Sequence, residues 1–205
     1  MVAGGTGRRF GGPKQFELVG DCRVIDHSRD AARSASDGVV VVVPAEHAER
    51  EGGVAGGETR SASVRAGLAA VPDDAAVVCV HDAARPFAST SLFERVIDAV
   101  RSGADGAIPG VPVSDTIKVV DDGVVVDTPD RSRLVAVQTP QAFRASVLRA
   151  AHEGDPAATD DAALVEAIGG TIVVVDGEPE NRKITRAEDL AWARRHVATT
   201  GRATT

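Results

Sequence analysis

The sequence has 205 residues, 43% hydrophobic and 26% charged, which is enough to bury the core of one α/β domain and short for two. Its formal net charge of -7 argues against a general nucleic-acid or membrane-surface function, because no long basic stretch could support either. We expect neither nucleic acid nor membrane as a partner. We expect a cytoplasmic protein, because no apolar run could span a bilayer and the N-terminus lacks a signal-peptide pattern.

The chain begins with a basic, glycine-rich segment, VAGGTGRRFGGPKQF, at residues 2–16. Its glycines allow the backbone to approach a ligand closely, and Arg9 and Lys14 add fixed positive charge. The segment is not a dinucleotide fingerprint, because Phe10 stands where the last glycine is required, and no G-K-[ST] follows as in a Walker loop. It therefore predicts a triphosphate-binding loop, with a flexible, solvated terminus as the alternative.

Valine- and isoleucine-rich runs alternate with helical patterns along the rest of the chain. Runs without polar alternation indicate strands buried on both faces of a parallel sheet, at 38–44, 76–82, 106–113 and 170–177. Helices are expected near 25–35, 60–70, 89–102, 142–152, 160–168 and 186–197. The alternation predicts an α/β fold, a three-layer sandwich with a mostly parallel, Rossmann-like sheet.

A hairpin interrupts this alternation. Two extended segments flank Asp122-Gly123, a dipeptide typical of two-residue hairpin turns. We expect residues 116–134 to project as an arm from a single domain that spans residues 1–198. The polar tail at 199–205 is expected to be disordered.

Polar motifs follow the predicted strands, at the sheet edge where ligands bind in open α/β folds. Asp82, in VHDAARPF, can hold a Mg²⁺ ion that bridges substrate phosphates, or it caps a turn with Arg85 as its salt-bridge partner. His81 is interpreted as a packed strand-end residue, because no second His or Cys stands at ligand spacing. Lys183, in NRKIT, faces a phosphate or caps the last helix. Such charged groups suit nucleotidyl transfer, which depends on positioning and charge neutralisation.

Two further motifs precede helices. GGETRSASV, at 56–64, suits the edge of a base and its ribose, although N-capping by Thr59 or Ser61 explains it equally well. TDDAAL, at 159–164, is typical of a threonine that caps an acidic first turn.

With these motifs in order, the chain resembles the 2-C-methyl-D-erythritol 4-phosphate cytidylyltransferase family from Val2 to about Val197. The resemblance rests on AGGTGRRFGGPKQF, GGETRSASV, VHDAARPF, VSDTIK, QTPQAF, TDDA and NRKITRAEDL. It implies a nucleotidyltransferase fold and an enzyme that transfers CMP from CTP to the 4-phosphate of 2-C-methyl-D-erythritol 4-phosphate, releasing pyrophosphate, in non-mevalonate isoprenoid biosynthesis. It also implies Mg²⁺ or another divalent cation.

The resemblance also implies roles for individual residues. Arg9 and Lys14 match cations that stabilise the reacting α-phosphate, and Arg131 and Lys183 match residues that position the substrate phosphate. Asp82 matches the aspartate on the metal side. Further matching or candidate substrate-binding positions are Ala3, Gly4, Gly57, Glu58, Ser63, Asp82, Arg85, Thr116, Thr139 and Thr159. Asn181 is carried over as a weaker companion of the metal-side aspartate.

In the family the hairpin arm exchanges between two subunits. We therefore expect a homodimer through residues 116–134, in which Thr116 and Arg131 serve the partner's site. The apolar face of the arm would be buried against the second chain.

The chain departs from the family pattern at three places. Glu58 replaces a usual aspartate and Asp161 a usual glutamate, which changes the reach of each carboxylate. Family members carry a full first strand before the glycine loop, whereas residues 1–3 supply only its end. We expect unpaired backbone groups beside this strand, each costing about 1–3 kcal/mol when buried. Our hypothesis is a misassigned start or a truncation, so that a longer N-terminus would stabilise the protein.

Two alternatives stay open. One is a cytidylyltransferase for another polyol phosphate, such as ribitol 5-phosphate, although HDAARP and TPQAF favour methylerythritol phosphate. The other is a catalytically silent nucleotide-binding module. The joint presence of Arg9, Lys14, Asp82 and Lys183 argues against that second alternative.

Overall fold

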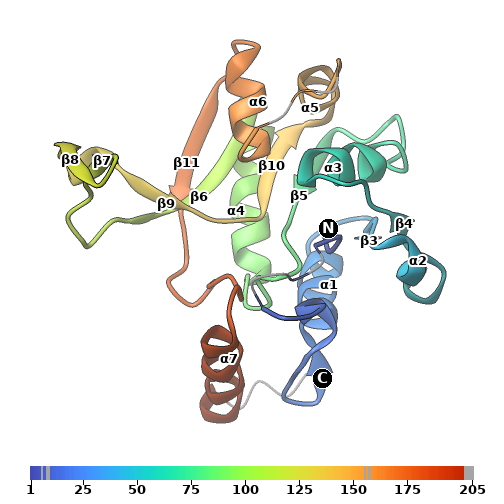
Figure 1. Ribbon diagram of the computed structural model, residues 1–205. Coiled ribbons are helices and arrows are strands. Elements are labelled where there is room, and N and C mark those ends of the chain that lie inside the picture. The colour runs from blue at the N-terminus through green and yellow to red at the C-terminus, as the bar shows by residue number, and fades with distance from the viewer. Residues whose placement is uncertain (6, 8–9, 155, 157, 201–205) are drawn as a thin grey trace.

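The computed structural model describes the chain except residues 6, 8–9, 155, 157 and 201–205 (Figure 1). Its helices are α1 (Val24–Ser34), α2 (Ala45–Glu51), α3 (Arg60–Leu68), α4 (Thr90–Arg101), α5 (Ala145–Ala151), α6 (Asp161–Ala167) and α7 (Ala187–Thr200), with 3₁₀ turns η1 (Lys14–Phe16) and η2 (Arg131–Arg133). Its strands are β1 (Leu18–Val19), β2 (Cys22–Arg23), β3 (Val42–Val43), β4 (Val54–Ala55), β5 (Val77–Val80), β6 (Gly106–Pro112), β7 (Val119–Asp121), β8 (Val124–Asp127), β9 (Val135–Val137), β10 (Gln141–Arg144) and β11 (Ile172–Asp176).

The main sheet has the strand order β11-β6-β10-β5, with β9 paired to β6. β11 runs parallel to β6, and β10 runs antiparallel to both β6 and β5, so β5, β6 and β11 share one direction. The short β3–β4 pair shares it as well, because Val2 forms parallel bridges to both Val42 and Asp82. The predicted α/β class with a mostly parallel sheet is therefore confirmed.

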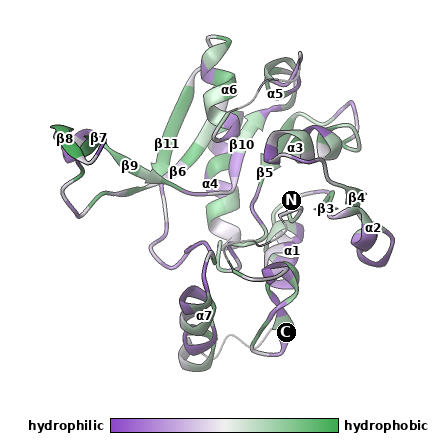
Figure 2. Cartoon of the chain, viewed as in Figure 1, coloured by the Kyte–Doolittle hydropathy of each residue, from purple (hydrophilic) through white to green (hydrophobic). Residues whose placement is uncertain are grey.

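Helices cover both faces of this sheet, which confirms the predicted layers (Figure 1). On one face, α4 packs on β5, β6 and β10 and also contacts α1. On the other, Val64, Leu148 and Leu164 from α3, α5 and α6 form a core with Val78 and Val80 of β5. Figure 2 shows hydrophobic residues along β6 and β11. Strands buried on both faces lack polar alternation, which is why the valine runs predicted them correctly.

The prediction of a helix at 142–152 is wrong for its first residues. Residues Gln141–Arg144 form β10, which pairs with β5 and β6 on its two sides. Phe143 is fully buried there, and its N–H and C=O groups lie within a strand ladder. A strand of four residues between apolar neighbours has the same composition as a buried helical turn, so periodicity does not separate them.

Two other segments also differ from expectation. Helix α7 extends through Thr199 and Thr200, the first two residues of the expected tail, and residues 201–205 lie outside the described part. Helix α2 was not expected from the sequence, since its seven residues, AEHAERE, carry no apolar periodicity. No helix among the described residues has the length and apolarity to cross a bilayer.

Strands β7 and β8 form the predicted hairpin, which projects from the sheet (Figure 1). Asp122 has φ 45° and Gly123 has φ 81°, the left-handed pair that a two-residue turn needs to follow strand twist. Figure 2 shows that β8 is strongly hydrophobic. Val124 is 65% exposed and Val126 is 59% exposed in the single chain, so the hairpin leaves apolar surface in water.

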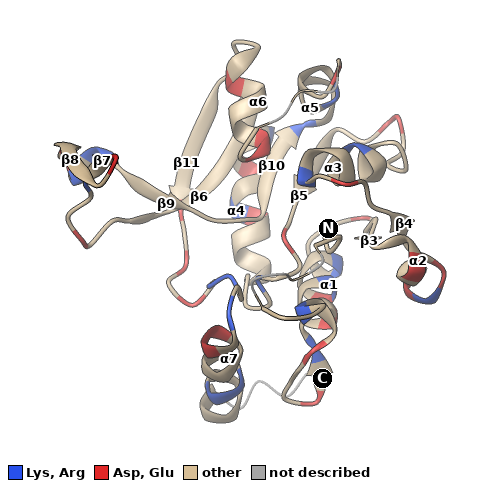
Figure 3. Cartoon of the chain, viewed as in Figure 1, with Lys and Arg blue, Asp and Glu red and all other residues tan. Residues whose placement is uncertain are grey.

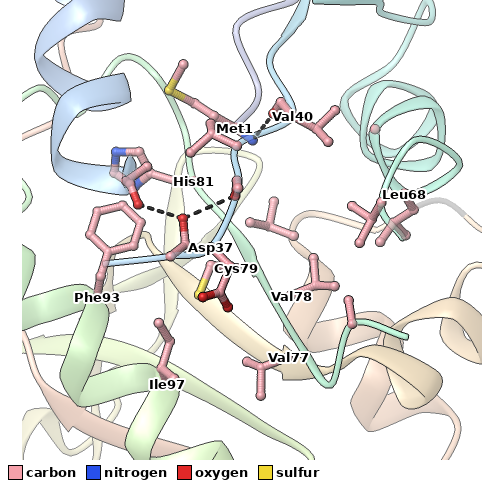
Figure 4. Close-up of a pocket in the computed structure, with 18 of the residues that line it drawn as sticks. Met1, Asp37, Val40, Leu68, Val77, Val78, Cys79, His81, Phe93 and Ile97 are labelled. Carbon is pink, nitrogen blue, oxygen red and sulfur yellow. Dashed lines mark hydrogen bonds between the residues drawn. The ribbon is translucent and has the colours of Figure 1, made fainter. Parts of the chain in front are cut away.

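An apolar opening separates β3 from β5 (Figure 4). Val2 donates its N–H to the His81 carbonyl at 2.7 Å, and Ala3 donates to the Val42 carbonyl at 2.7 Å, so one residue bridges two strands. The ammonium of Met1 donates to the Val40 carbonyl at 2.8 Å, and burial lowers its pKa to about 6. Behind it lies a cavity of ≈ 640 Å³ with apolar walls from β5, α3 and α4. An apolar cavity therefore lies beside Val2, between β3 and β5, while the expected unpaired backbone groups stay a prediction.

Candidate active site

Asp82 follows the carboxyl end of β5, as the sequence predicted for an open α/β sheet. Its Oδ2 lies 2.5 Å from Lys183 Nζ, and its Oδ1 lies 3.4 Å from Arg60 Nε. Burial by itself raises the pKa of Asp82, but the charges of Lys183 and Arg60 outweigh this effect and lower it to about 2. Asp82 is therefore an ionised carboxylate at neutral pH, held between two cations.

Hydrogen bonds within the protein fix the backbone at Asp82. The Asp82 N–H donates to Thr139 Oγ1 at 3.0 Å, and Thr139 Oγ1 lies 3.2 Å from His81 Nδ1. His81 Nε2 lies 3.2 Å from the Arg85 carbonyl, which only accepts, so Nε2 carries the proton and Nδ1 accepts from Thr139. Burial lowers the pKa of His81 to about 3, so its ring is neutral. His81 is a packed strand-end residue, as interpreted from the sequence.

The segment around Asn181 brings Lys183 to Asp82. Asn181 is fully buried, and its Nδ2 donates to the Thr139 carbonyl at 2.9 Å. Arg85 Nη1 donates to the Asn181 carbonyl at 2.8 Å. Arg85 therefore binds this segment, and among the described residues the cations on the Asp82 carboxylate are Lys183 and Arg60, which corrects the alternative that paired Arg85 with Asp82. Figure 3 shows basic residues on the segment that leads into α7.

The opening segment meets the start of α3. A Cβ added at Gly4 would lie 3.2 Å from Ser63 Oγ, and one at Gly57 would lie 2.5 Å from Ala62 Cβ. Gln15 Nε2 donates to the Ala3 carbonyl at 3.0 Å, which ties the glycine segment to η1. Ala3, Gly4, Gly57 and Ser63 therefore lie in one region, and nucleotide binding there stays a prediction.

The other predicted residues are more dispersed. Lys14 begins η1, while Arg9 lies outside the described residues. Arg131 is exposed on the arm and donates to the Ser114 carbonyl, and Thr116 is exposed on the same arm. Glu58 and Thr159 are exposed in the loops before α3 and α6. Within one chain the arm projects away from the sheet (Figure 1), and the described hydrogen bonds join neither Thr116 nor Arg131 to Asp82.

Arg60 was not predicted as a site residue, although it lies within the motif GGETRSASV. Arg60 Nη1 lies 2.7 Å from Asp161 Oδ2, and Asp161 Oδ1 lies 3.0 Å from His152 Nε2. Asp161 is buried, so the aspartate that replaces a usual glutamate still reaches a partner. The sequence did contain a signal for Arg60. A cation in the first turn of a helix is disfavoured by the helix dipole, so it indicates a carboxylate partner from elsewhere in the chain.

Asp82 is also the residue that could hold a divalent cation. The described residues contain no group of three or more His, Cys, Asp or Glu side chains arranged to bind a metal. Mg²⁺ typically binds one or two carboxylates together with substrate phosphates and water, rather than an all-protein cage. A single ionised carboxylate at the end of β5 fits that mode of binding.

A family model described as 2-C-methyl-D-erythritol 4-phosphate cytidylyltransferase matches residues 1–199. This chain belongs to that family. The cytidylyltransferase of Rhodococcus jostii is 47% identical over 208 residues, which cover 95% of this chain and 92% of the relative. The crystal structure of the Thermus thermophilus cytidylyltransferase has a TM-score of 0.82 at 35% identity, covering 93% of this chain and 96% of that one.

Another family structure, the 4-diphosphocytidyl-2C-methyl-D-erythritol synthase of Anaerococcus prevotii, has a TM-score of 0.84 at 30% identity and covers 96% of this chain and 95% of that one. A bifunctional enzyme IspD/IspF of Nitratidesulfovibrio vulgaris is 54% identical over 142 residues. That match covers 67% of this chain and 36% of the relative, so the chain spans about a third of that relative's length. Cytidylyltransferases thus occur both as separate proteins and within a longer one.

Proposed function

We propose that this chain transfers CMP from CTP to the 4-phosphate of 2-C-methyl-D-erythritol 4-phosphate, producing 4-diphosphocytidyl-2-C-methyl-D-erythritol and pyrophosphate. The observation that carries the proposal is the Asp82–Lys183 pair, 2.5 Å apart at the carboxyl end of β5, in a chain whose family is named for this reaction. A carboxylate beside an ammonium offers partners for both a cation-bound nucleotide and an anionic acceptor.

In the proposed reaction, a phosphate oxygen of the acceptor forms a bond to the α-phosphorus of CTP. The bond between that phosphorus and the bridging oxygen to the β-phosphate breaks, and its electron pair leaves with pyrophosphate. Charge builds up on the α-phosphate oxygens, where Lys14 and Arg9 would neutralise it. Lys183, whose side chain is 37% exposed, would bind the acceptor phosphate. A bound Mg²⁺, held by Asp82 and the nucleotide phosphates, would neutralise charge on the leaving group.

The proposal includes a homodimer. Thr116 and Arg131 lie on the arm, which projects away from the sheet (Figure 1). The valines of the hairpin are exposed to water in the single chain. A second chain would cover this apolar surface. Arg131 would then reach the substrate phosphate in the site of that second chain. A cytoplasmic location stays a prediction from the sequence.

The test is pyrophosphate release with Mg²⁺, for four nucleoside triphosphates crossed with methylerythritol phosphate and ribitol 5-phosphate. We expect release with CTP and methylerythritol phosphate together. Release with ribitol 5-phosphate instead would assign the enzyme to another acceptor. Nucleotide binding measured by calorimetry, without release in any combination, would indicate the silent module and contradict the proposal.

A further inference from the structure

We propose that Arg60 is a positioning residue, which fixes the Asp82 carboxylate relative to the predicted nucleotide-binding motif at 56–64. The inference rests on the proposed function, because it assigns Asp82 to the cation-bound nucleotide. The local structure does not favour a cation at this position. Arg60 is the first residue of α3, where the helix dipole disfavours positive charge and where the Thr59 side chain already caps the helix. The position of this cation therefore requires an explanation from tertiary contacts.

Two carboxylates from distant parts of the chain supply that explanation. Arg60 Nη1 lies 2.7 Å from Asp161 Oδ2, and Arg60 Nε lies 3.4 Å from Asp82 Oδ1. The guanidinium is planar, so holding one of its nitrogens restricts the direction in which the others point. Arg60 thereby links the beginning of α3, the end of β5 and the beginning of α6.

The far end of this link is buried. Asp161 is 1% exposed and is the first residue of α6, where the helix dipole favours a carboxylate. Its Oδ1 lies 3.0 Å from Nε2 of His152, which is 5% exposed at the end of α5. Two core helices therefore hold Asp161, and Asp161 holds Arg60.

At the near end of the link, the two carboxylate oxygens of Asp82 contact different cations. Arg60 faces Oδ1, and Lys183 faces Oδ2 from a more exposed side chain. If Lys183 moves to the acceptor phosphate, Oδ2 becomes available while Arg60 continues to hold Oδ1. A lysine at position 60 would keep the charge but lose the planar fork that reaches two carboxylates, so charge alone should not replace this arginine.

The experiment compares Arg60→Met, Arg60→Lys and Asp161→Asn with the wild type. Arg101→Met is the matched control, since Arg101 is 68% exposed on α4 and pairs with Asp98 at 3.8 Å. Mn²⁺ binding is measured by electron paramagnetic resonance with CTP present and the acceptor absent. The Mg²⁺ concentration for half-maximal rate, the KM of the acceptor and the thermal unfolding midpoint are measured in parallel.

We expect Arg60→Met to weaken Mn²⁺ binding with CTP about tenfold and to raise the half-maximal Mg²⁺ concentration similarly, as for loss of one charged hydrogen bond. The KM of the acceptor should stay unchanged. Arg60→Lys should resemble Arg60→Met, Asp161→Asn should shift both quantities in the same direction, and Arg101→Met should match the wild type.

A lower unfolding midpoint with unchanged Mn²⁺ binding and Mg²⁺ dependence would overturn the inference, because Arg60 would then only stabilise the fold. Full recovery in Arg60→Lys would also overturn it. A wild type that binds Mn²⁺ with CTP but transfers no CMP would contradict the proposed function, while weaker binding in Arg60→Met would still support the inference. A wild type that neither binds nor reacts would contradict both.

Discussion

Asp82 shows how single residues define this site. Its carboxylate accepts from Lys183 on one oxygen and from Arg60 on the other, and its N–H donates to Thr139. Their positions after predicted strands made Asp82 and Lys183 candidates, with a turn cap and a helix cap as the alternatives, and the family resemblance assigned Asp82 to the metal and Lys183 to the substrate phosphate. Arg60 was not predicted, because its partners are 22 and 101 residues away in the sequence.

Lys183 can be tested against its neighbour. Lys183→Met should lower kcat/KM for the acceptor about 10- to 100-fold, because a charged hydrogen bond to phosphate is lost. Arg182→Met is the control, since the Arg182 guanidinium lies 4.5 Å from the centre of the Trp192 ring rather than at Asp82. Steady-state kinetics over acceptor concentration provides the measurement. Equal losses in both variants would contradict the assignment of Lys183.

The lowered pKa of Glu51 predicts that the stability of the fold depends on pH. Hydrogen bonds from Arg23, together with contacts to Arg29 and Arg50, lower the pKa of Glu51 from 4.5 to about 2. A lowered pKa in the folded state means that this stabilisation is full above the unfolded pKa and is lost as pH falls through about 2.

Glu51→Gln should therefore reduce the free energy of unfolding by about 2 kcal/mol at pH 7. The difference from the wild type should persist down to about pH 5 and shrink below pH 4.5. Urea unfolding across this pH range measures it, with Glu49→Gln, an exposed neighbour on α2, as the control. A difference that does not change with pH would contradict the charge argument.

At the scale of elements, the sequence indicated where strands lie better than how they pair. The valine runs marked β5 and β11, but the pairing of β10 between β5 and β6 depends on residues more than 30 positions away. The opening beside β5 also lies between segments that are far apart in the sequence. Val2 pairs with strands on both sides, and beyond it the walls of the opening remain apolar.

The opening predicts that added apolar strand stabilises the protein. A valine-rich extension of about five residues joined to Met1 should enter between β3 and β5, pair with their backbones and raise Tm by about 4–8 °C, for about 2 kcal/mol. A glycine-serine extension of equal length is the control, because it pairs without filling the cavity. Thermal unfolding measures both. Equal Tm values would show that the opening does not accept a strand.

At the scale of the whole molecule, the β7–β8 arm is the feature that a single chain does not explain. A hairpin of two strands is marginal by itself, and its valines are exposed on both strands. Contiguous exposed apolar surface is typical of a protein interface. The proposed second copy would cover this surface.

Replacing Val124 and Val126 with aspartate should convert the proposed dimer to a monomer, because buried carboxylates without partners oppose association. Activity should fall with it, since Arg131 would no longer reach the second site. Sedimentation velocity measures the state, and Ile168→Asp, at a residue 52% exposed after α6, is the control. A monomeric wild type, or a double variant that stays dimeric, would contradict the proposed assembly.

The sequence by itself determined the α/β class, the hairpin arm and the positions of Asp82 and Lys183 after strands, because strand burial, turn chemistry and motifs at strand ends are local patterns. Only the tertiary structure decided the reversed strand β10 and the Arg60–Asp161–His152 link. These features depend on backbone pairing and on charges that meet across long sequence separations. Local periodicity carries no record of such partners, so the folded chain alone brings them together.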